Sequence, residues 1–253
     1  MSVNRLIGRI AIVTASTDGI GFAIAQRLAR EGAKVIISSR KAKNVEEATQ
    51  KLTKEGLNVT GLVCHVGKSE DREKLFKEAS NLGGLDILVS NAAVNPEVGG
   101  VLDCSESSWD KIFEINVKCS FLLAKEALPL LRKSKAGRII FISSIAGFQP
   151  IEVLGAYSIS KTALLGLVKT AALQLAPENI TVNGVSPGLV ATKFSRAITD
   201  NPAASEASLA QIPIGRFAKP DDISGSVAFL ASDDGAYVTG ENIVVAGGMA
   251  SRL

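Results

Sequence analysis

The sequence predicts an α/β protein with one doubly wound, seven-stranded parallel sheet and helices on both faces. Short runs rich in Val and Ile alternate with longer segments of helical periodicity, which is the pattern of repeated strand–helix–strand units. A glycine-rich turn, TASTDGIG, follows the first of these runs. The chain has 253 residues, of which 46% are hydrophobic and 21% are charged, and these values suit a globular protein with one large core. We therefore expect a single domain over residues 1–253.

Seven strands are expected, and most of them run into polar or glycine-rich residues. Their sequences are RIAIVT (9–14), KVIISS (34–39), NVTGLVC (58–64), DILVSN (86–91), GRIIFISS (137–144), ITVNGVSP (180–187) and NIVVAGG (242–248). The intervening helices are expected from 19, at 45–55, at 71–81, from about 106, around YSISK, and from 220. A Rossmann-type sheet of this kind has the expected order 3-2-1-4-5-6-7 and binds ligands at the carboxyl ends of its strands.

Charge and composition exclude several classes of protein. The chain has 28 Lys and Arg and 25 Asp and Glu, a net charge of +3, which is too balanced for a nucleic-acid-binding surface. Arg5 and Arg9 interrupt the apolar N-terminal segment, so we expect neither a signal peptide nor a membrane span. Cys64, Cys104 and Cys119 lack the paired spacing of zinc or redox motifs, so no metal site is expected and a reducing compartment fits.

The turn after the first strand is expected to bind phosphate. Its small residues let a pyrophosphate approach the backbone N–H groups of the turn and of the helix start. A tight strand-to-helix turn needs glycine in any case, and Ala15 stands where a glycine is common. Because the turn opens an alternating strand–helix chain, we favour nucleotide binding by Ala15, Ser16, Thr17, Gly19, Ile20 and Gly21.

The residues after the second strand favour NADP over NAD. A ribose 2′-hydroxyl is usually bound by a carboxylate at this place, whereas a 2′-phosphate needs donors and positive charge. The chain offers a hydroxyl, a guanidinium, an ammonium and an amide, from Ser39, Arg40, Lys41 and Asn44. Asp18 weakens this prediction, because it adds a negative charge to the neighbouring turn.

The segment YSISK offers a proton donor to a chain that has a single histidine. Tyr157 and Lys161 are four residues apart, so on a helix the phenol and the ammonium reach one small volume. A nearby cation favours phenolate, and we expect it to lower the tyrosine pKa from its usual value of about 10. Ser144, at the end of the fifth strand, is expected to hold a carbonyl oxygen beside the phenol. Without these neighbours, a tyrosine and a lysine at this spacing are more often ordinary helix surface.

Together these motifs resemble the short-chain dehydrogenase/reductase family over essentially the whole chain. The resemblance rests on TASTDGIG, SNAA, INVK, ISSIAG, YSISK, SPGLVAT and SDDGAYVTGENIVVAGG, in this order. It implies that Tyr157 donates the proton, that Ser144 orients the carbonyl, and that Lys161 lowers the tyrosine pKa and holds the nicotinamide ribose. It also implies a water relay anchored by Asn116. Further cofactor contacts are implied for Asn91 and Ala92 on the ribose side, and for Pro187, Gly188, Val190 and Thr192 at the nicotinamide end.

The chain departs from the family pattern at two places. Where the family usually has an aspartate against the adenine amino group, this chain has His65 and Val66, which we expect on the adenine side of the cofactor or at the surface. VAGG at 245–248 replaces the common VDGG, in a region of assembly more than of chemistry. The family implies a homotetramer built on the two long helices and the last strand.

Within the family, the chain is similar to a group of peroxisomal NADPH-dependent carbonyl reductases and retinol dehydrogenases. The similarity rests on TASTDGIGFAIA, SSRK, VTGLVCHVGK, LVSNAAVNP, SKTALLGL and the SRL ending. It implies reduction of aromatic ketones, α-dicarbonyls, quinones, and retinal or ketosteroids. The segment 193–211 has no pattern that names the substrate. An apolar ligand agrees with residues that could equally form core or subunit contacts, namely Ile145, Phe148, Ile151, Val153, Leu154, Leu189 and Phe194.

Two alternative functions and one targeting signal are also considered. A 3-oxoacyl thioester reductase of lipid metabolism would use the same Ser, Tyr and Lys. A non-catalytic NADP-binding protein is disfavoured by the intact set of Asn116, Ser144, Tyr157 and Lys161. The last three residues, Ser251, Arg252 and Leu253, form a small, basic, leucine tail like the signal read by the peroxisomal import receptor. We expect a peroxisomal protein, or a cytoplasmic one if the tail is not read.

Overall fold

The computed structural model describes residues 4–251, and in this range seven parallel strands form one sheet. The order β3-β2-β1-β4-β5-β6-β7 confirms the predicted topology. The direction of winding reverses between β1 and β4, so the carboxyl ends of these strands mark the expected ligand crevice. The strands are β1 (Ile10–Val13), β2 (Lys34–Ser39), β3 (Val59–Val63), β4 (Ile87–Ser90), β5 (Arg138–Ile142), β6 (Thr181–Pro187) and β7 (Asn242–Val245).

Helices connect the strands, and capping residues or glycines mark where some of them start and end. For example, Asp18 caps the first helix through its side chain, and Gly83 ends the third helix in the left-handed region at a φ of 119°. The helices are α1 (Gly19–Arg30), α2 (Ala42–Lys54), α3 (Ser69–Leu82), α4 (Glu106–Phe113), α5 (Cys119–Leu131), α6 (Gly155–Leu175), α7 (Arg196–Thr199), α8 (Pro202–Leu209) and α9 (Pro220–Ala231).

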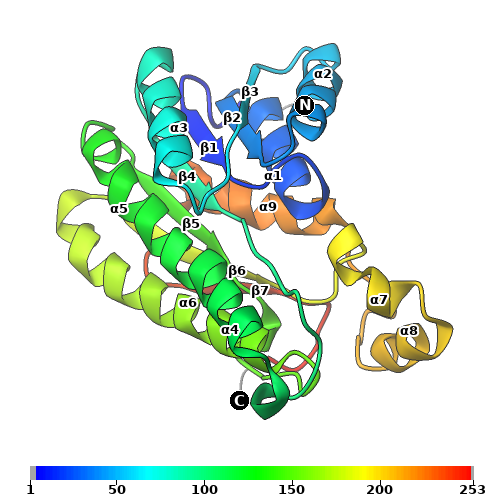
Figure 1. Ribbon diagram of the computed structural model, residues 1–253. Helices are drawn as coiled ribbons and strands as arrows, with labels where there is room; N and C mark the ends of the chain where they lie inside the picture. Colours follow the sequence, from blue (N-terminus) through cyan, green and yellow to red (C-terminus); the bar gives the residue numbers. More distant parts are fainter. Residues whose placement is uncertain (1–3, 252–253) are drawn as a thin grey trace.

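Helices cover both faces of the sheet, and each face has its own hydrophobic cluster (Figure 1). Successive residues of a strand point to opposite faces, so Ala11 and Val13 pack with α1, α2 and α9, while Ile12 packs with α3, α5 and α6. Leu28 and Leu123, from opposite layers, are both fully buried. This double burial explains why the strands are continuously apolar.

Several boundaries differ from the prediction. Helix α2 begins at Ala42, three residues before the expected start, and α3 begins at Ser69, two residues before. The long helix expected from Glu106 is divided into α4 and α5 by a π-helical turn, η2 (Glu114–Lys118). A π turn inserts an extra residue into the helical ladder and often marks a functional position. Here it carries Asn116.

A lobe, residues 193–211, lies between β6 and α9 and projects from the body of the protein (Figure 1). It contains η5 (Lys193–Ser195), α7 and α8. Its base is held by a parallel bridge between Val190 and Ala218 and by two hydrogen bonds, from Ala191 N to Ala218 O (2.9 Å) and from Ala218 N to Leu189 O (3.0 Å). The lobe therefore starts and ends at one fixed point beside the carboxyl end of β6.

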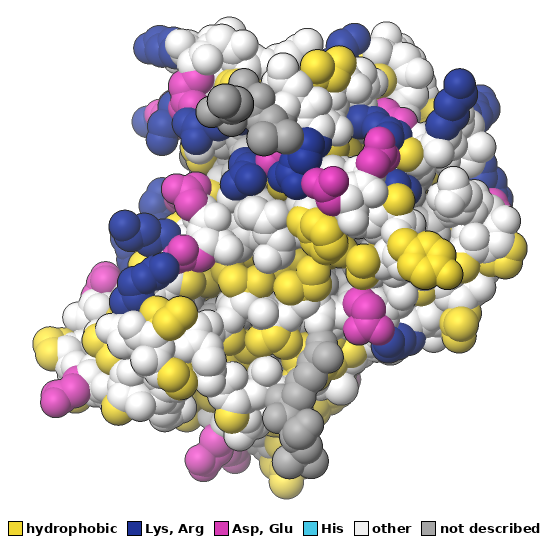
Figure 2. Space-filling model, turned by 180° about the vertical axis from the view of Figure 1, so that it is seen from behind, with side chains coloured by type: hydrophobic (Ala, Val, Ile, Leu, Met, Phe, Trp, Pro, Cys, Tyr) yellow, Lys and Arg dark blue, Asp and Glu magenta, His cyan; other side chains and the backbone are white. Residues whose placement is uncertain are grey.

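Within residues 4–251, no helix combines the length and the apolar character needed to cross a membrane. Figure 2 shows hydrophobic side chains gathered in a band across the middle of one face, with charged side chains around it.

Candidate active site

The predicted phosphate turn is braced by the end of β4. The Thr14 hydroxyl accepts hydrogen bonds from Asn91 N (3.0 Å) and Ala92 N (3.2 Å). The Asn91 side chain donates back to Thr14 O (3.0 Å) and Ala15 O (3.1 Å). Ala15 has a φ of 50°, in the left-handed region where an alanine is uncommon. The amide of Asn91, which the family resemblance placed on the ribose side, is thus used to hold the turn in this conformation.

Close packing within the turn explains one of its glycines. A Cβ atom at Gly21 would lie 2.5 Å from both Ala15 O and Asn91 Nδ2, so no larger residue fits. Ser16 is also structural, because its hydroxyl donates to Val13 O (2.6 Å) and accepts from Ser38 N (3.0 Å). Among the predicted turn residues, Ala15 is exposed, and Thr17, Gly19 and Ile20 are partly exposed at the helix start. The exposed helix N-terminus fits a pyrophosphate.

The residues after β2 present positive charge to the same edge of the sheet. Ser39 is half-buried, and Arg40, Lys41 and Asn44 are exposed. No ion pair within residues 4–251 involves Arg40 or Lys41, so both cations can meet an external anion. This set of donors fits a 2′-phosphate better than a free ribose hydroxyl.

His65 and Val66 follow β3, as predicted. One ring nitrogen and the backbone N–H of His65 are engaged in hydrogen bonds with nearby residues. Its Nδ1 accepts a hydrogen bond from Gly67 N (3.0 Å), and its backbone N–H donates to Asp71 Oδ2 (3.0 Å). Val66 is buried in the core cluster beneath α3 and α5. His65 shapes the turn after β3, at the expected adenine side of the sheet edge.

The predicted catalytic residues converge at the carboxyl end of β5. Ser144 follows this strand, and its side chain is hydrogen-bonded to that of Tyr157 on α6. One turn further along α6, Lys161 Nζ lies 5.5 Å from the centroid of the Tyr157 ring. The ammonium nitrogen donates to Ile142 O (2.8 Å), which fixes it to the end of β5. Sequence reasoning therefore placed these three side chains correctly in one volume.

Burial dominates the electrostatics of this group. It raises the pKa of Tyr157 to about 12, and the hydrogen bond with Ser144 opposes this only in part. Burial also lowers the pKa of Lys161 from 10.5 to about 7. The direction for Tyr157 differs from the predicted lowering, because desolvation outweighs any stabilisation of the phenolate by a lysine that is itself desolvated. Tyr157 accordingly holds its proton at neutral pH, as a proton donor must.

Asn116 is connected to the catalytic helix by a residue that the sequence analysis did not single out. Its side chain accepts from Val94 N (2.8 Å) and donates to Val94 O (3.0 Å) and Ser160 Oγ (3.0 Å). Ser160 in turn donates to Tyr157 O (2.7 Å). Ser143 acts similarly, by donating to Lys161 O (3.0 Å). Small hydroxyl residues beside the catalytic ones were the available signal, since buried hydroxyls need partners.

The residues expected at the nicotinamide end lie on one path from β6 to the lobe. Pro187 is buried in β6, Gly188 N donates to Val245 O (2.9 Å), and Val190 forms the bridge at the base of the lobe. Thr192 caps η5, and its methyl group lies close to Gly19, where a Cβ atom would be 3.3 Å away. These positions bring the predicted nicotinamide residues next to the phosphate turn.

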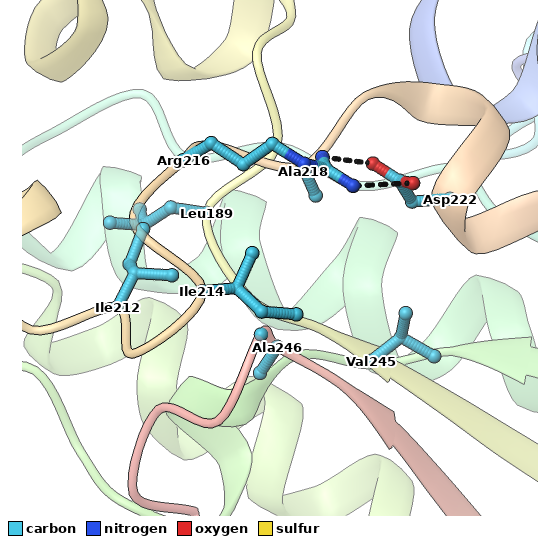
Figure 3. A pocket seen from close by; sticks show the side chains of 9 residues that line it. Leu189, Ile212, Ile214, Arg216, Ala218, Asp222, Val245 and Ala246 are labelled. Atoms are coloured by element: carbon cyan, nitrogen blue, oxygen red, sulfur yellow. Dashed lines mark hydrogen bonds and ion pairs between the residues drawn. The ribbon is translucent and has the colours of Figure 1, made fainter.

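A small apolar cavity of about 200 Å³ lies under the base of the lobe (Figure 3). Residues from both limbs of the lobe base line it, together with the end of β7, and the ion pair between Arg216 and Asp222 stands at its edge. Its lining includes Leu189 but none of the catalytic residues. We therefore regard it as a packing gap beneath the lobe and not as the substrate site.

The apolar residues predicted near the catalytic group differ in how deeply they are buried. The Phe194 ring of η5 lies against Tyr157, with 5.7 Å between ring centroids. Ile145 is buried beside Ser144, so it belongs to the core. The remaining predicted apolar residues are half-buried or exposed: Phe148, Ile151, Val153, Leu154 and Leu189. No group of His, Cys, Asp or Glu in the described part of the chain is placed to hold a metal ion.

Known proteins are similar to this chain over almost its whole length. A family model described as "Enoyl-(Acyl carrier protein) reductase" matches residues 14–250. Dehydrogenase/reductase SDR family member 4 of Oryctolagus cuniculus is 54% identical over 98% of this chain and 96% of its own length. The human protein of that name is 52% identical over 98% of this chain and 90% of its own length.

Solved structures are similar over almost the whole chain. The Pseudomonas aeruginosa RhlG/NADP active-site complex has a TM-score of 0.90 and 35% identity, covering 98% of each chain. A protein assigned as an NAD(P)-dependent gluconate 5-dehydrogenase from Beutenbergia cavernae, with bound NADP, has a TM-score of 0.91 and 31% identity, covering 97% of this chain and 98% of its own.

The buried lysine predicts a specific pH dependence of stability. Between about pH 7 and pH 10.5 the unfolded chain retains the Lys161 proton that the folded chain has released, so stability rises with pH in this window. Compared with Lys161→Met, the wild type should gain up to about 1.4 kcal/mol per pH unit as pH increases from 7 to 10. Urea unfolding of both proteins at several pH values measures this. A difference that does not change with pH would show that Lys161 has an ordinary pKa in the folded protein.

Proposed function

The chain belongs to the short-chain dehydrogenase/reductase family, and we propose that within it this protein is an NADP(H)-dependent reductase of ketone and aldehyde carbonyls. One observation carries the proposal. The hydrogen-bonded side chains of Ser144 and Tyr157 lie at the same sheet edge as a glycine-rich turn, with Lys161 one turn further on. Arg40, which has no ion pair within residues 4–251, lies at this edge too.

The protein residues divide the reaction between binding and proton transfer. NADPH, when bound, supplies the hydride that reduces the carbonyl carbon. Ser144 donates a hydrogen bond to the carbonyl oxygen and orients it beside the Tyr157 hydroxyl. Tyr157, protonated at neutral pH, gives its proton to the same oxygen, which completes the alcohol. Lys161 and Asn116 hold Tyr157 and its helix in place and connect the site to a proton supply.

NADP is favoured as the cofactor by the residues after β2 and by the relatives. Arg40 and Lys41 have no intramolecular ion pair in the described chain, and the carboxylate that would bind a ribose hydroxyl is replaced by Ser39. The two similar structures described above contain NADP. The phosphate turn provides the pyrophosphate site, and Pro187, Gly188, Val190 and Thr192 would face the nicotinamide.

The proposed substrates are small apolar carbonyl compounds: aromatic ketones, α-dicarbonyls, quinones, and retinal or ketosteroids. The exposed ring of Phe194, which lies against Tyr157, supports this class. A 3-oxoacyl thioester is the second candidate, because the matching family model is described as an acyl carrier protein reductase. Steady-state assays of NADPH oxidation with both classes of carbonyl distinguish them, and no turnover of either would leave a non-catalytic NADP-binding protein.

We also propose a homotetramer, as the family resemblance implies. Strand β7 is the last strand of the sheet, and Phe121 of α5 and Leu173 of α6 are exposed hydrophobic residues on the long helices. The hydrophobic band in Figure 2 adds support. Contiguous exposed apolar patches often mark sites where proteins associate. Light scattering of the purified protein gives the mass that decides this.

Peroxisomal import through the last three residues is a further part of the proposal. Ser251 is half-buried, while Arg252 and Leu253 lie outside the described residues. Deleting Ser251 to Leu253 should leave an active enzyme in the cytosol, because none of the proposed catalytic or cofactor-binding residues is removed. Microscopy of tagged wild type and deletion variant measures localisation, with the tag placed at the N-terminus. The same distribution for both would remove the signal from consideration.

The Tyr157→Phe variant tests proton donation. The ring still packs against Phe194, so NADPH binding should be retained, whereas turnover should fall by about 10² to 10⁴ because the transferable proton is gone. Cofactor fluorescence titration and kcat with a reducible carbonyl measure the two effects. Near-native turnover would contradict the assigned role of Tyr157.

The Arg40→Ala variant tests cofactor choice. Charge-assisted hydrogen bonds are worth about 1.5 to 3 kcal/mol, so NADPH binding should weaken roughly ten- to a hundredfold, whereas NADH binding should barely change. Ser39→Asp should go further, by repelling the phosphate and offering a carboxylate to the NAD ribose. The measurement is kcat/KM for both cofactors in wild type and both variants. Equal losses with NADPH and NADH in Arg40→Ala would make the arginine structural.

A further inference from the structure

A carboxylate stands in the proposed phosphate turn, where it opposes the binding of an anion. Asp18 caps α1, and its Oδ1 accepts a hydrogen bond from Gly19 N at 2.8 Å. The cap stabilises the helix, and a negative charge is favourable at a helix N-terminus. The same charge repels a pyrophosphate that approaches this N-terminus. A cofactor site with this residue therefore needs a compensating cation.

The compensating cation comes from the first turn of the lobe. Lys193 Nζ lies 2.6 Å from Asp18 Oδ2, with both side chains partly exposed, at 71% and 54%. This ion pair is the main cause that lowers the pKa of Asp18, and Arg196 adds to it through its charge. Asp18 is therefore ionised, and Lys193 neutralises it. The pair joins the turn after β1 to a segment some 175 residues later in the chain.

The turn that carries Lys193 is well ordered by its own hydrogen bonds. Thr192 and Ser195 form a capping box around η5, in which Thr192 N donates to Ser195 Oγ at 3.1 Å. Ser195 Oγ also donates to Val190 O at 2.5 Å, which ties the turn to the base of the lobe. The Thr192 methyl group packs close to Gly19, beside the ion pair. Lys193 is thus held at Asp18 by more than its own flexible side chain.

The next residue of the same turn reaches the other half of the active site. Phe194 follows Lys193, and its ring lies against that of Tyr157 at 5.7 Å. One short turn thus contacts the proposed phosphate site through Lys193 and the catalytic tyrosine through Phe194. If Lys193 is released from Asp18, the contact of Phe194 with Tyr157 loses its support from the cofactor side.

We propose that Lys193 is a positioning residue that cancels the charge of Asp18 and thereby makes the turn compatible with the cofactor pyrophosphate while it holds the lobe over the active site. This inference rests on the proposed binding of NADP(H). It assigns to Lys193 a role that acts through Asp18 and not through the cofactor itself. One ion pair then has two separate effects, on the charge of the turn and on the position of the lobe.

A double-mutant cycle measured as cofactor affinity tests the charge compensation. Lys193→Met leaves Asp18 uncompensated, so the Kd for NADPH, followed by fluorescence, should rise about three- to tenfold. Asp18→Asn should bind at least as tightly as the wild type, and adding Lys193→Met to Asp18→Asn should cause no further loss. Lys193→Arg should retain wild-type affinity. An equal loss in both backgrounds, or no loss in either, would overturn the inference.

A matched ion pair supplies the control for general surface effects. Lys169 Nζ and Glu241 Oε1 are 3.1 Å apart, with side chains exposed by 61% and 54%, and both residues lie away from the proposed cofactor site. Lys169→Met and Glu241→Gln should leave the Kd for NADPH within about twofold of wild type. A loss as large as that of Lys193→Met would assign the effect to the net charge of the protein and overturn the specific role of the Asp18 pair.

Proteolysis in the absence of cofactor tests the hold on the lobe separately. Chymotrypsin sites in the lobe, after Phe194 and Leu209, should be cleaved several times faster in Asp18→Asn and Lys193→Met than in wild type, because the turn is no longer held. Cleavage rates equal to those of wild type would overturn this part of the inference. If wild type fails to bind NADPH at all, the proposed function fails, and the proteolysis still reports on the ion pair.

Discussion

The hydrogen bond from Lys161 Nζ to Ile142 O connects the catalytic helix to the sheet, and the arrangement of the site depends on it. It lies at the carboxyl end of β5, where it gives a hydrogen-bond donor to the backbone carbonyl of the last strand residue. Together with the bond from Ser143 to Lys161 O, it sets the position of α6 along the strand. Tyr157, one turn earlier on α6, is thereby placed beside Ser144 at the end of the same strand.

Burial of the Lys161 ammonium group costs solvation free energy, and this cost explains its lowered pKa. An ammonium group removed from water loses solvation that one carbonyl oxygen does not fully replace, so its pKa falls to about 7. The protein therefore keeps near its tyrosine a group that can change charge close to neutral pH. An exposed lysine at the same helical spacing would hold a fixed charge and give less scope for tuning the proton donor.

The fold could be predicted from the sequence because the same pattern, an apolar strand followed by a helix, recurs along the chain. Strands such as β1 and β5 are buried on both faces, so their apolar runs are unmistakable, and their shared direction brings the following polar residues to one edge. The catalytic residues could be placed from the four-residue spacing of Tyr157 and Lys161 and from the family resemblance. Boundaries were less predictable, since α2 begins at Ala42 and its N-cap residue, Lys41, makes no side-chain cap hydrogen bond.

What the sequence could not predict are the contacts between distant segments and the balance between burial and charge. The sign of the Tyr157 pKa depends on how much water the folded protein excludes, which no spacing reveals. Asp18 looked unfavourable for an anion site because its partner, Lys193, is far away in the sequence and is brought to it only by the fold of the lobe. Under the proposed role of Lys193, the acidic residue of this turn is paired with a cation from a distant part of the chain. Lys193 is followed by Phe194, whose ring lies against that of Tyr157. The short turn η5 therefore connects the proposed phosphate end of the site to its proposed carbonyl end.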